Sequence, residues 1–130
     1  PQSFRAAIAT ASALRGNRRL VFVAGTMREL GSDAESLHKE IAGALMELRP
    51  DLLAAVGDFV PALQPHARTL GDRLLTAPDP LALGPLLLQR LRGDELVVLK
   101  ASRGVALERI LPALTARAQS GAPVAPIPPA

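Results

Sequence analysis

Four short apolar runs, separated by segments with helical periodicity, constrain the fold of this chain more than any other feature. The runs are residues 20–24, 52–56, 72–76 and 95–100. The first of them, Leu-Val-Phe-Val-Ala, is continuously apolar and rich in branched side chains, a pattern typical of a strand that is covered on both faces. Between the runs, apolar residues recur at the spacing of amphipathic helices. Strands that alternate with helices in this way predict an α/β domain.

Turn and capping residues indicate where the helices begin and end. Gly16 is placed to end the first helix, Pro50 to end the second, and Asp79 to cap the fourth. Pro112 should kink or split the last one. The predicted helices cover residues 3–14, 33–49, 58–70, 80–91 and 105–114. Because helical crossovers join consecutive parallel strands, we expect a Rossmann-like, mostly parallel sheet with helices on both faces.

The length and composition suit one folded domain with a short tail. The chain has 130 residues, of which 48% are apolar, enough to fill one core. From residue 119 the sequence turns to Gly, Ala and Pro, so we expect a domain over residues 1–118 and a flexible tail over residues 119–130. The chain begins at Pro1 rather than at Met, directly before a helix, and we expect it to be a piece of a larger protein.

The composition also excludes several function classes. Without cysteine, the chain cannot use disulfides, thiolate catalysis or cysteine-ligated metals. It has no Trp or Tyr, and its net charge of +3 comes from basic residues interleaved with acids, so we expect no nucleic-acid partner. No apolar run is long enough to span a bilayer and no signal peptide opens the chain, which predicts a cytoplasmic protein without membrane insertion.

Two polar turns follow predicted strands, at the edge where parallel sheets bind their ligands. The first of these contains Lys100, Ser102 and Arg103, two cations and a hydroxyl at the start of a helix. Free N–H groups at a helix N-terminus favour an anion, and Arg can clamp a carboxylate or a phosphate. The alternative interpretation is that Ser102 only caps the helix while the two cations pair with nearby acids. The spacing of the residues leaves both interpretations open.

The other polar turn, residues 25–33, fits neither common phosphate-binding motif. Its glycines lack the GxGxxG spacing, and no Gly-Lys-Ser/Thr follows. His38 lies at the edge of the buried stripe of the next helix, and we interpret it as a half-buried packing residue rather than a catalytic one. His38 and His66 do not have metal-ligand spacing. The residues alone therefore predict no catalytic group and no metal site in this domain.

Three motifs resemble one branch of the Mur ligase family. Residues 23–31, Val-Ala-Gly-Thr-Met-Arg-Glu-Leu-Gly, are followed by Glu, His and Gly at positions 35, 38 and 43, and resemble that branch's LGDMxELG…E…H…G stretch. Residues 97–104, with Glu108, resemble its VLVKGSRG…ME stretch. Residues 1–7 resemble the end of its YNANPxSMxAA motif. The resemblance covers residues 1–117 in the expected order.

The resemblance implies that the chain is the C-terminal domain of a three-domain ligase. This branch uses ATP to join D-alanyl-D-alanine to UDP-N-acetylmuramoyl-tripeptide in cytoplasmic peptidoglycan precursor synthesis. The first domain holds the UDP-sugar, and the central domain holds most of the ATP and Mg²⁺ contacts. The implied partners are therefore these substrates and the ligase's own other two domains. The C-terminal domain closes over ATP and the incoming dipeptide, and by itself it is expected to be inactive.

The resemblance also suggests roles for individual residues. Lys100, Ser102 and Arg103 would form the rim that receives the dipeptide carboxylate or the phosphates, in agreement with the anion site inferred above. Arg28 and Glu29 would border the nucleotide cleft.

Two positions depart from the pattern, and a third keeps two interpretations. Thr26 stands where the family usually has Asp, which leaves the role of that carboxylate unassigned here. Ala101 replaces the usual Gly and should constrain the turn. His38 belongs to the family motif, while the packing interpretation stays open for it.

A second function fits the same residues: a stand-alone Rossmann-like module that binds an anion or a partner without catalysis. A ligase that adds a different amino acid is a closer alternative, but the Asp-Asn-Pro-Arg element of the diaminopimelate-adding relative is absent.

We predict that the gene encoding this chain also encodes a Gly-Lys-Ser/Thr P-loop upstream of Pro1. The central domain of a Mur ligase would carry this motif, since the motif binds the ATP phosphates. Sequencing the upstream coding region checks the prediction. A gene that encodes little beyond these residues would support the binding module instead.

Overall fold

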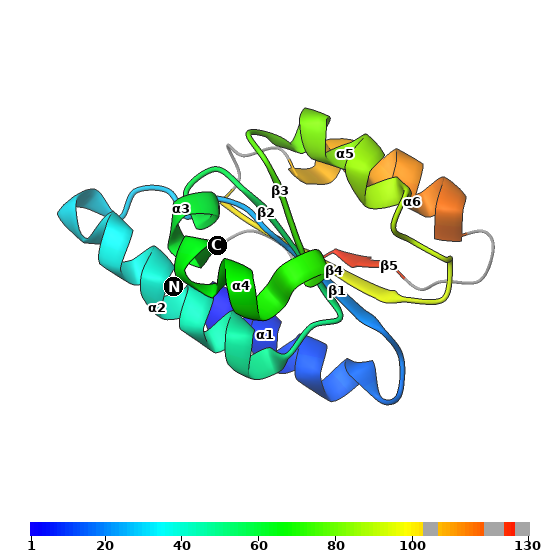
Figure 1. Ribbon diagram of the computed structural model, residues 1–130, viewed down its shortest axis with the longest axis horizontal. Coiled ribbons are helices and arrows are strands. Elements are labelled where there is room, and N and C mark those ends of the chain that lie inside the picture. The colour runs from blue at the N-terminus through cyan, green and yellow to red at the C-terminus, as the bar shows by residue number, and fades with distance from the viewer. Residues whose placement is uncertain (103–106, 119–123, 127–130) are drawn as a thin grey trace.

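The computed structural model describes residues 1–102, 107–118 and 124–126, and it contains one parallel sheet between two layers of helices (Figure 1). The sheet has five strands in the order β3-β2-β1-β4-β5. The strands are β1 (Leu20–Ala24), β2 (Leu52–Val56), β3 (Leu74–Ala77), β4 (Leu96–Lys100) and β5 (Val124–Pro126). Every pair of neighbouring strands is parallel, which confirms the predicted Rossmann-like α/β fold.

The helices divide between the two faces of the sheet, with α1 to α4 on one face and α5 and α6 on the other (Figure 1). They are α1 (Gln2–Arg15), α2 (Ala34–Leu48), α3 (Phe59–Leu63), α4 (Ala67–Leu70), α5 (Pro80–Leu88) and α6 (Leu111–Ala118). Within the described residues, no helix combines the length and the apolar character needed to cross a membrane.

The continuous apolar character of β1 is explained by two separate cores. Leu20, Phe22 and Ala24 point into the core beneath α1 to α4, while Val21 and Val23 point into the core beneath α5 and α6. Since side chains alternate between the faces of a strand, a strand between two cores must be apolar at every position.

The three phenylalanines of the chain meet in the first of these cores. The ring of Phe4 in α1 lies 6.0 Å from that of Phe22 in β1 and 5.0 Å from that of Phe59 in α3, measured between centroids. These tilted ring contacts fix the start of α1 against the sheet.

Several predicted elements differ from the structure. The helix predicted over residues 80–91 ends at Leu88. Within the described residues, the last predicted helix, 105–114, is a 3-10 turn over Leu107–Ile110 followed by α6, which runs on to Ala118.

One continuous helix over residues 58–70 is wrong, because a 3-10 turn over Gln64–His66 separates α3 from α4. Pro65 lies in this turn and lacks the N–H that a continuing α-helix would need. The third strand was predicted over residues 72–76, but in the structure it begins two residues later, at Leu74, because Gly71–Arg73 forms another 3-10 turn.

An additional strand lies within the segment that the sequence predicts as a tail. Val124–Pro126 pairs in parallel with Val97, Val98 and Leu99 of β4. Proline is tolerated on an edge strand, where one side of the backbone has no strand to bond to. The pairing places part of residues 119–130 on the domain, and the division of the chain at residue 118 stays a prediction.

An ion pair fastens the ends of α1 and α2 to the start of β1. The Asp51 Oδ2 atom accepts hydrogen bonds from the Leu20 N–H and from Arg15 Nη2, both at 2.7 Å. Arg15 Nη1 also donates to the carbonyls of Leu48 at 3.2 Å and Arg49 at 2.8 Å. Burial by itself would raise the pKa of Asp51, but the Leu20 hydrogen bond and the Arg15 charge outweigh it and hold the pKa below its ordinary value.

We predict that Asp51→Asn lowers the free energy of unfolding at pH 7 by about 1–2 kcal/mol, the scale of a charge-assisted hydrogen bond. Because the folded-state pKa of Asp51 is lowered, its stabilisation is present above the unfolded pKa of about 3.9 and is lost as the pH falls through the folded value. Urea unfolding of the wild type and of Asp51→Asn at several pH values from 7 to 2 measures this difference in the free energy of unfolding.

Asp72 is exposed and gives a matched control. The free energy of unfolding of Asp72→Asn should stay close to that of the wild type at every pH. An Asp51→Asn deficit that persists undiminished at pH 2 would contradict the assigned interaction.

Candidate functional site

The two polar turns predicted from the sequence lie side by side at the carboxyl edge of the sheet. The Gly25 N–H donates to the Lys100 carbonyl at 2.9 Å, and the Ser102 N–H donates to the Thr26 carbonyl at 3.1 Å. The Arg28 N–H donates to the Ser102 Oγ atom at 2.7 Å. Three hydrogen bonds therefore join the loop after β1 to the loop after β4, although more than 70 residues separate them in sequence.

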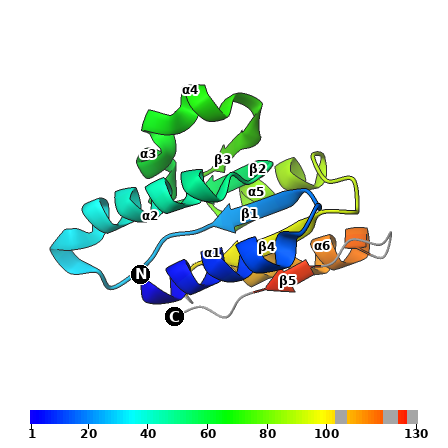
Figure 2. The same ribbon diagram turned by 90° about the horizontal axis from the view of Figure 1, so that it is seen from below.

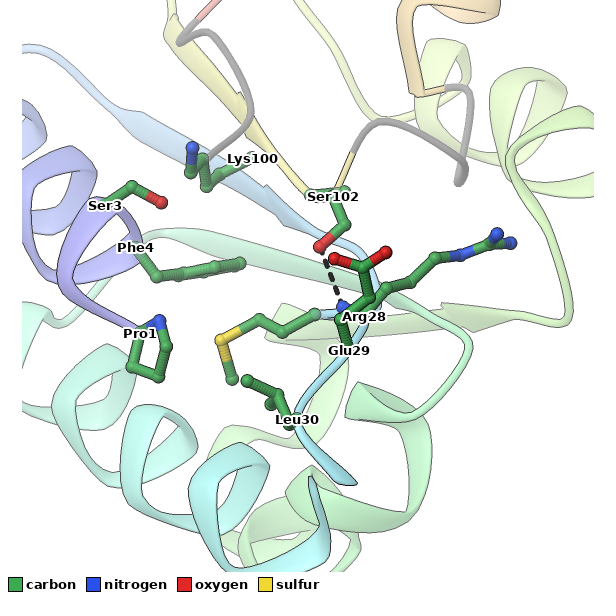
Figure 3. Close-up of a pocket in the computed structure, with 10 residues that line it drawn as sticks. Pro1, Ser3, Phe4, Arg28, Glu29, Leu30, Lys100 and Ser102 are labelled. Carbon is green, nitrogen blue, oxygen red and sulfur yellow. Dashed lines mark hydrogen bonds between the residues drawn. The ribbon is translucent and has the colours of Figure 1, made fainter. Parts of the chain in front are cut away.

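A cavity of about 490 Å³ opens beside this junction, and we call it the rim cavity (Figure 3). Three elements line it: the first turn of α1, the loop after β1 and the end of β4. Figure 2 shows the start of α1 and the loop after β1 at the end of the sheet to which the β1 arrow points. Its lining residues are Pro1, Ser3, Phe4, Met27, Arg28, Glu29, Leu30, Lys100, Ala101 and Ser102. The contribution of α1 was not predicted from the sequence, because periodicity does not show which strand end a helix start faces.

Lys100 supplies a buried cation to the wall of the rim cavity. It is the last residue of β4 and is only 1% exposed. Burial lowers the pKa of its ammonium group, because the charged form loses hydration. A cation with reduced access to water interacts more strongly with an anion than one at the surface does.

Ser102 has a partner that neither interpretation of the sequence predicted. Its hydroxyl accepts the Arg28 N–H, so the side chain fastens the loop after β1 (Figure 3). Arg103, the second predicted cation, and Gly104 lie outside the described residues.

Arg28 and Glu29 line the rim cavity, but in different ways. The guanidinium of Arg28 extends away from the other labelled residues, so this residue contributes mainly backbone (Figure 3). Glu29 has a left-handed backbone with φ 62°, an uncommon conformation for a residue with a Cβ atom. Such strain is found preferentially at binding sites, where the surrounding structure holds it in place.

Thr26 connects the loop after β1 to the turn that follows β2. Its Oγ1 atom accepts the Asp58 N–H at 2.8 Å, at the turn that follows β2. Gly57 in that turn has φ 63°, and a Cβ atom there would overlap Thr26 Oγ1. The threonine that departs from the family pattern therefore has a structural role, and the turn can approach it only because residue 57 is glycine.

His38 is fully buried, at 1% exposure, rather than half-buried as predicted. Its Nε2 atom accepts the Met27 N–H at 2.9 Å, and its Nδ1 atom lies 2.7 Å from the Ala34 carbonyl. Since a backbone N–H can only donate and a carbonyl only accept, these contacts require a neutral ring with its proton on Nδ1. The ring also packs edge-on against Phe59, with 4.8 Å between centroids. His38 thus packs in the core and also holds the loop.

A second cavity of about 740 Å³, the back cavity, lies between α2 and α3. It is lined by Ala34, Glu35, His38, Lys39, Asp58, Pro61, Ala62, Gln64 and Pro65. Glu35 and Lys39 pair with each other at 3.0 Å on its wall. Among the described residues, no group of three or more His, Cys, Asp or Glu side chains is placed to hold a metal ion.

Comparisons with a protein-family model and with solved structures both find Mur ligases. The family described as "Mur ligase, glutamate ligase domain" matches residues 1–103. The structure of MurF ligase from Thermotoga maritima in complex with ADP is 26% identical, with a TM-score of 0.67, over 94% of this chain and 27% of that chain. A structure of MurF from Acinetobacter baumannii is 27% identical, with a TM-score of 0.71, over 89% of this chain and 25% of that chain. The chain thus spans about a quarter of the length of these proteins.

We predict that Glu29→Gly raises the free energy of unfolding by up to about 1 kcal/mol, because glycine adopts the left-handed conformation without the Cβ clash. Chemical denaturation of the purified chain measures this. Arg49→Gly is the matched control, since Arg49 is also left-handed, with φ 55°, and lies at the end of α2 away from the rim cavity. A loss of stability in Glu29→Gly alone would show that the Glu29 side chain, and not its backbone, decides the loop's stability.

Proposed function

The chain belongs to the Mur ligase family, in which it matches the glutamate ligase domain, and from this premise we propose that it is the C-terminal domain of a MurF-type ligase. In this proposal, the complete enzyme, which we call the parent ligase, joins D-alanyl-D-alanine to UDP-N-acetylmuramoyl-tripeptide in peptidoglycan precursor synthesis. The rim cavity carries the proposal, because it places the buried cation Lys100 at the carboxyl edge of the sheet. The chain shares this fold, and 26% sequence identity, with the matched MurF ligases.

The proposed reaction forms an amide in two steps. ATP phosphorylates the terminal carboxylate of the tripeptide and leaves as ADP. The amine of D-alanyl-D-alanine then attacks the acyl phosphate, which forms the amide and releases phosphate. Both the phosphates and the carboxylate of the dipeptide are anions. A domain that closes over them needs cations and N–H donors rather than a nucleophile or a base of its own.

Lys100 is the residue that we assign to anion binding at this edge. Its ammonium group is withdrawn from bulk water, so an incoming carboxylate or phosphate meets little competition from solvent. Ser102 supports this role indirectly, since its hydroxyl holds the Arg28 backbone and therefore the loop that lines the cavity. Arg103 is proposed as a second cation of the same rim, while Arg28 and Glu29 border the nucleotide.

The other parts of the reaction are assigned to the other domains of the parent ligase. In this proposal the central domain carries the P-loop and the Mg²⁺ ligands, and the N-terminal domain binds the UDP-sugar. The chain by itself is then inactive. Because the reaction uses ATP and a nucleotide-linked precursor, we place it in the cytoplasm. We do not favour a stand-alone binding module, since the matched MurF structures are about three and a half times as long as this chain (94%/27% and 89%/26%, from the shares of the two chains that are covered).

We predict that Lys100→Met in the parent ligase raises the KM for D-alanyl-D-alanine, or for ATP, at least tenfold, the scale of one charge-assisted hydrogen bond. Methionine keeps about the same buried volume and removes the ammonium group. Phosphate release measured with and without the dipeptide reports the effect.

Lys39→Met is the matched control, because Lys39 is the other lysine of the chain and is exposed on α2, where it pairs with Glu35. Its kinetic constants should stay within about twofold of wild type. Near-normal turnover and unchanged KM values in Lys100→Met would refute the assignment of Lys100.

A further inference from the structure

Three consecutive residues of the loop after β1 are held by three other parts of the molecule: the turn after β2, helix α2 and the turn after β4. Thr26 is bonded to the turns after β4 and β2, and Arg28 is bonded to Ser102. Between them, the Met27 N–H is held by the imidazole of His38, which lies on α2. Met27 and the three residues that follow it all line the rim cavity. The direction in which the chain leaves Met27 therefore decides the shape of one wall of that cavity.

Within the described residues, the bond from His38 is the hydrogen bond that joins a side chain of α2 to the part of this loop that lines the rim cavity, residues 27–30. This hydrogen bond is buried and His38 is only 1% exposed, so its loss would leave a buried N–H group with little access to water. The Nδ1 contact to the Ala34 carbonyl fixes the tautomer, which leaves Nε2 as an acceptor directed at Met27.

We propose that His38 is a positioning residue for the rim cavity, through which α2 sets the backbone of Met27 and so the orientation of the loop that receives the anionic groups. The proposal rests on the proposed function for the identity of those groups. The hydrogen bonds of His38 go to Met27 and Ala34, so the route from His38 to the rim cavity runs through the backbone of the loop.

The two nitrogens of the ring allow the loop contact to be separated from packing and from helix stability. Glutamine can place a carbonyl oxygen near the position of Nε2, and so keep the acceptor for Met27. Asparagine is shorter, and can keep a donor near the position of Nδ1 for the Ala34 carbonyl but cannot reach Met27. Both variants remove the ring that packs against Phe59, and asparagine, which is one methylene shorter than glutamine, leaves the larger space.

The first experiment measures amide hydrogen exchange of the 130-residue chain by NMR. We expect the Met27 amide to exchange about tenfold faster in His38→Asn than in His38→Gln, relative to core amides of β1 in the same sample, because only the former loses the acceptor. Equal relative rates at Met27 in the two variants would overturn the proposal. The ¹⁵N shifts of the wild-type ring give a check that needs no variant, and a proton on Nε2 would likewise overturn it.

The second experiment measures steady-state kinetics of the parent ligase with ATP and D-alanyl-D-alanine. We expect the KM for ATP or for D-alanyl-D-alanine to be about tenfold higher in His38→Asn than in His38→Gln, while the kcat values stay similar. The two variants are compared at a matched fraction of folded protein. Equal KM values in the two variants would show a purely structural role. A wild-type enzyme without dipeptide-dependent phosphate release would reject the proposed function instead, and the exchange rates would then still decide whether His38 sets the loop.

Discussion

The parallel hydrogen bonding of β1 to both of its neighbours is the constraint on which the rest of the structure depends. Ala24 at its end is level with Ala55 in β2 and with Lys100 in β4. Because the three strands end at one level, the loops that follow them leave the sheet together and can bond to one another. Thr26 uses this arrangement: its carbonyl reaches the β4 loop and its hydroxyl reaches the β2 turn. The rim cavity is thus a consequence of strand register.

Charge is distributed unevenly between the two edges of the sheet. At the amino edge, Asp51 accepts the Leu20 N–H before β1, and the buried Glu95 accepts the N–H groups of Arg92 at 2.8 Å and Gly93 at 2.9 Å before β4. Burial by itself would raise the pKa of Glu95, but these backbone hydrogen bonds lower it. At the carboxyl edge, Lys100 is the buried charged residue among those that the structure describes. The ammonium group of Lys100 contributes positive charge at the edge where the rim cavity lies.

Much of this arrangement could be predicted from local patterns. The bounds of β1 and β2 were predicted correctly, since apolar runs of five residues between turn signals have few other interpretations. Asp79 caps α5 as expected, with the Ala82 N–H donating to Oδ1 at 2.8 Å. The break between α3 and α4 and the pairing of β5 were not predicted, because they depend on how a proline turn and an edge strand pack against the domain.

The sequence by itself determined the order of strands and helices, the parallel sheet and the edge at which a ligand site should lie. It did so because hydrophobic periodicity and turn residues act over short distances along the chain. Only the tertiary structure decided what His38 and Thr26 do, and that the start of α1 helps to form the rim cavity. A hydrogen bond between Met27 and a histidine eleven residues away depends on how α2 packs against the sheet, and no local pattern specifies that geometry.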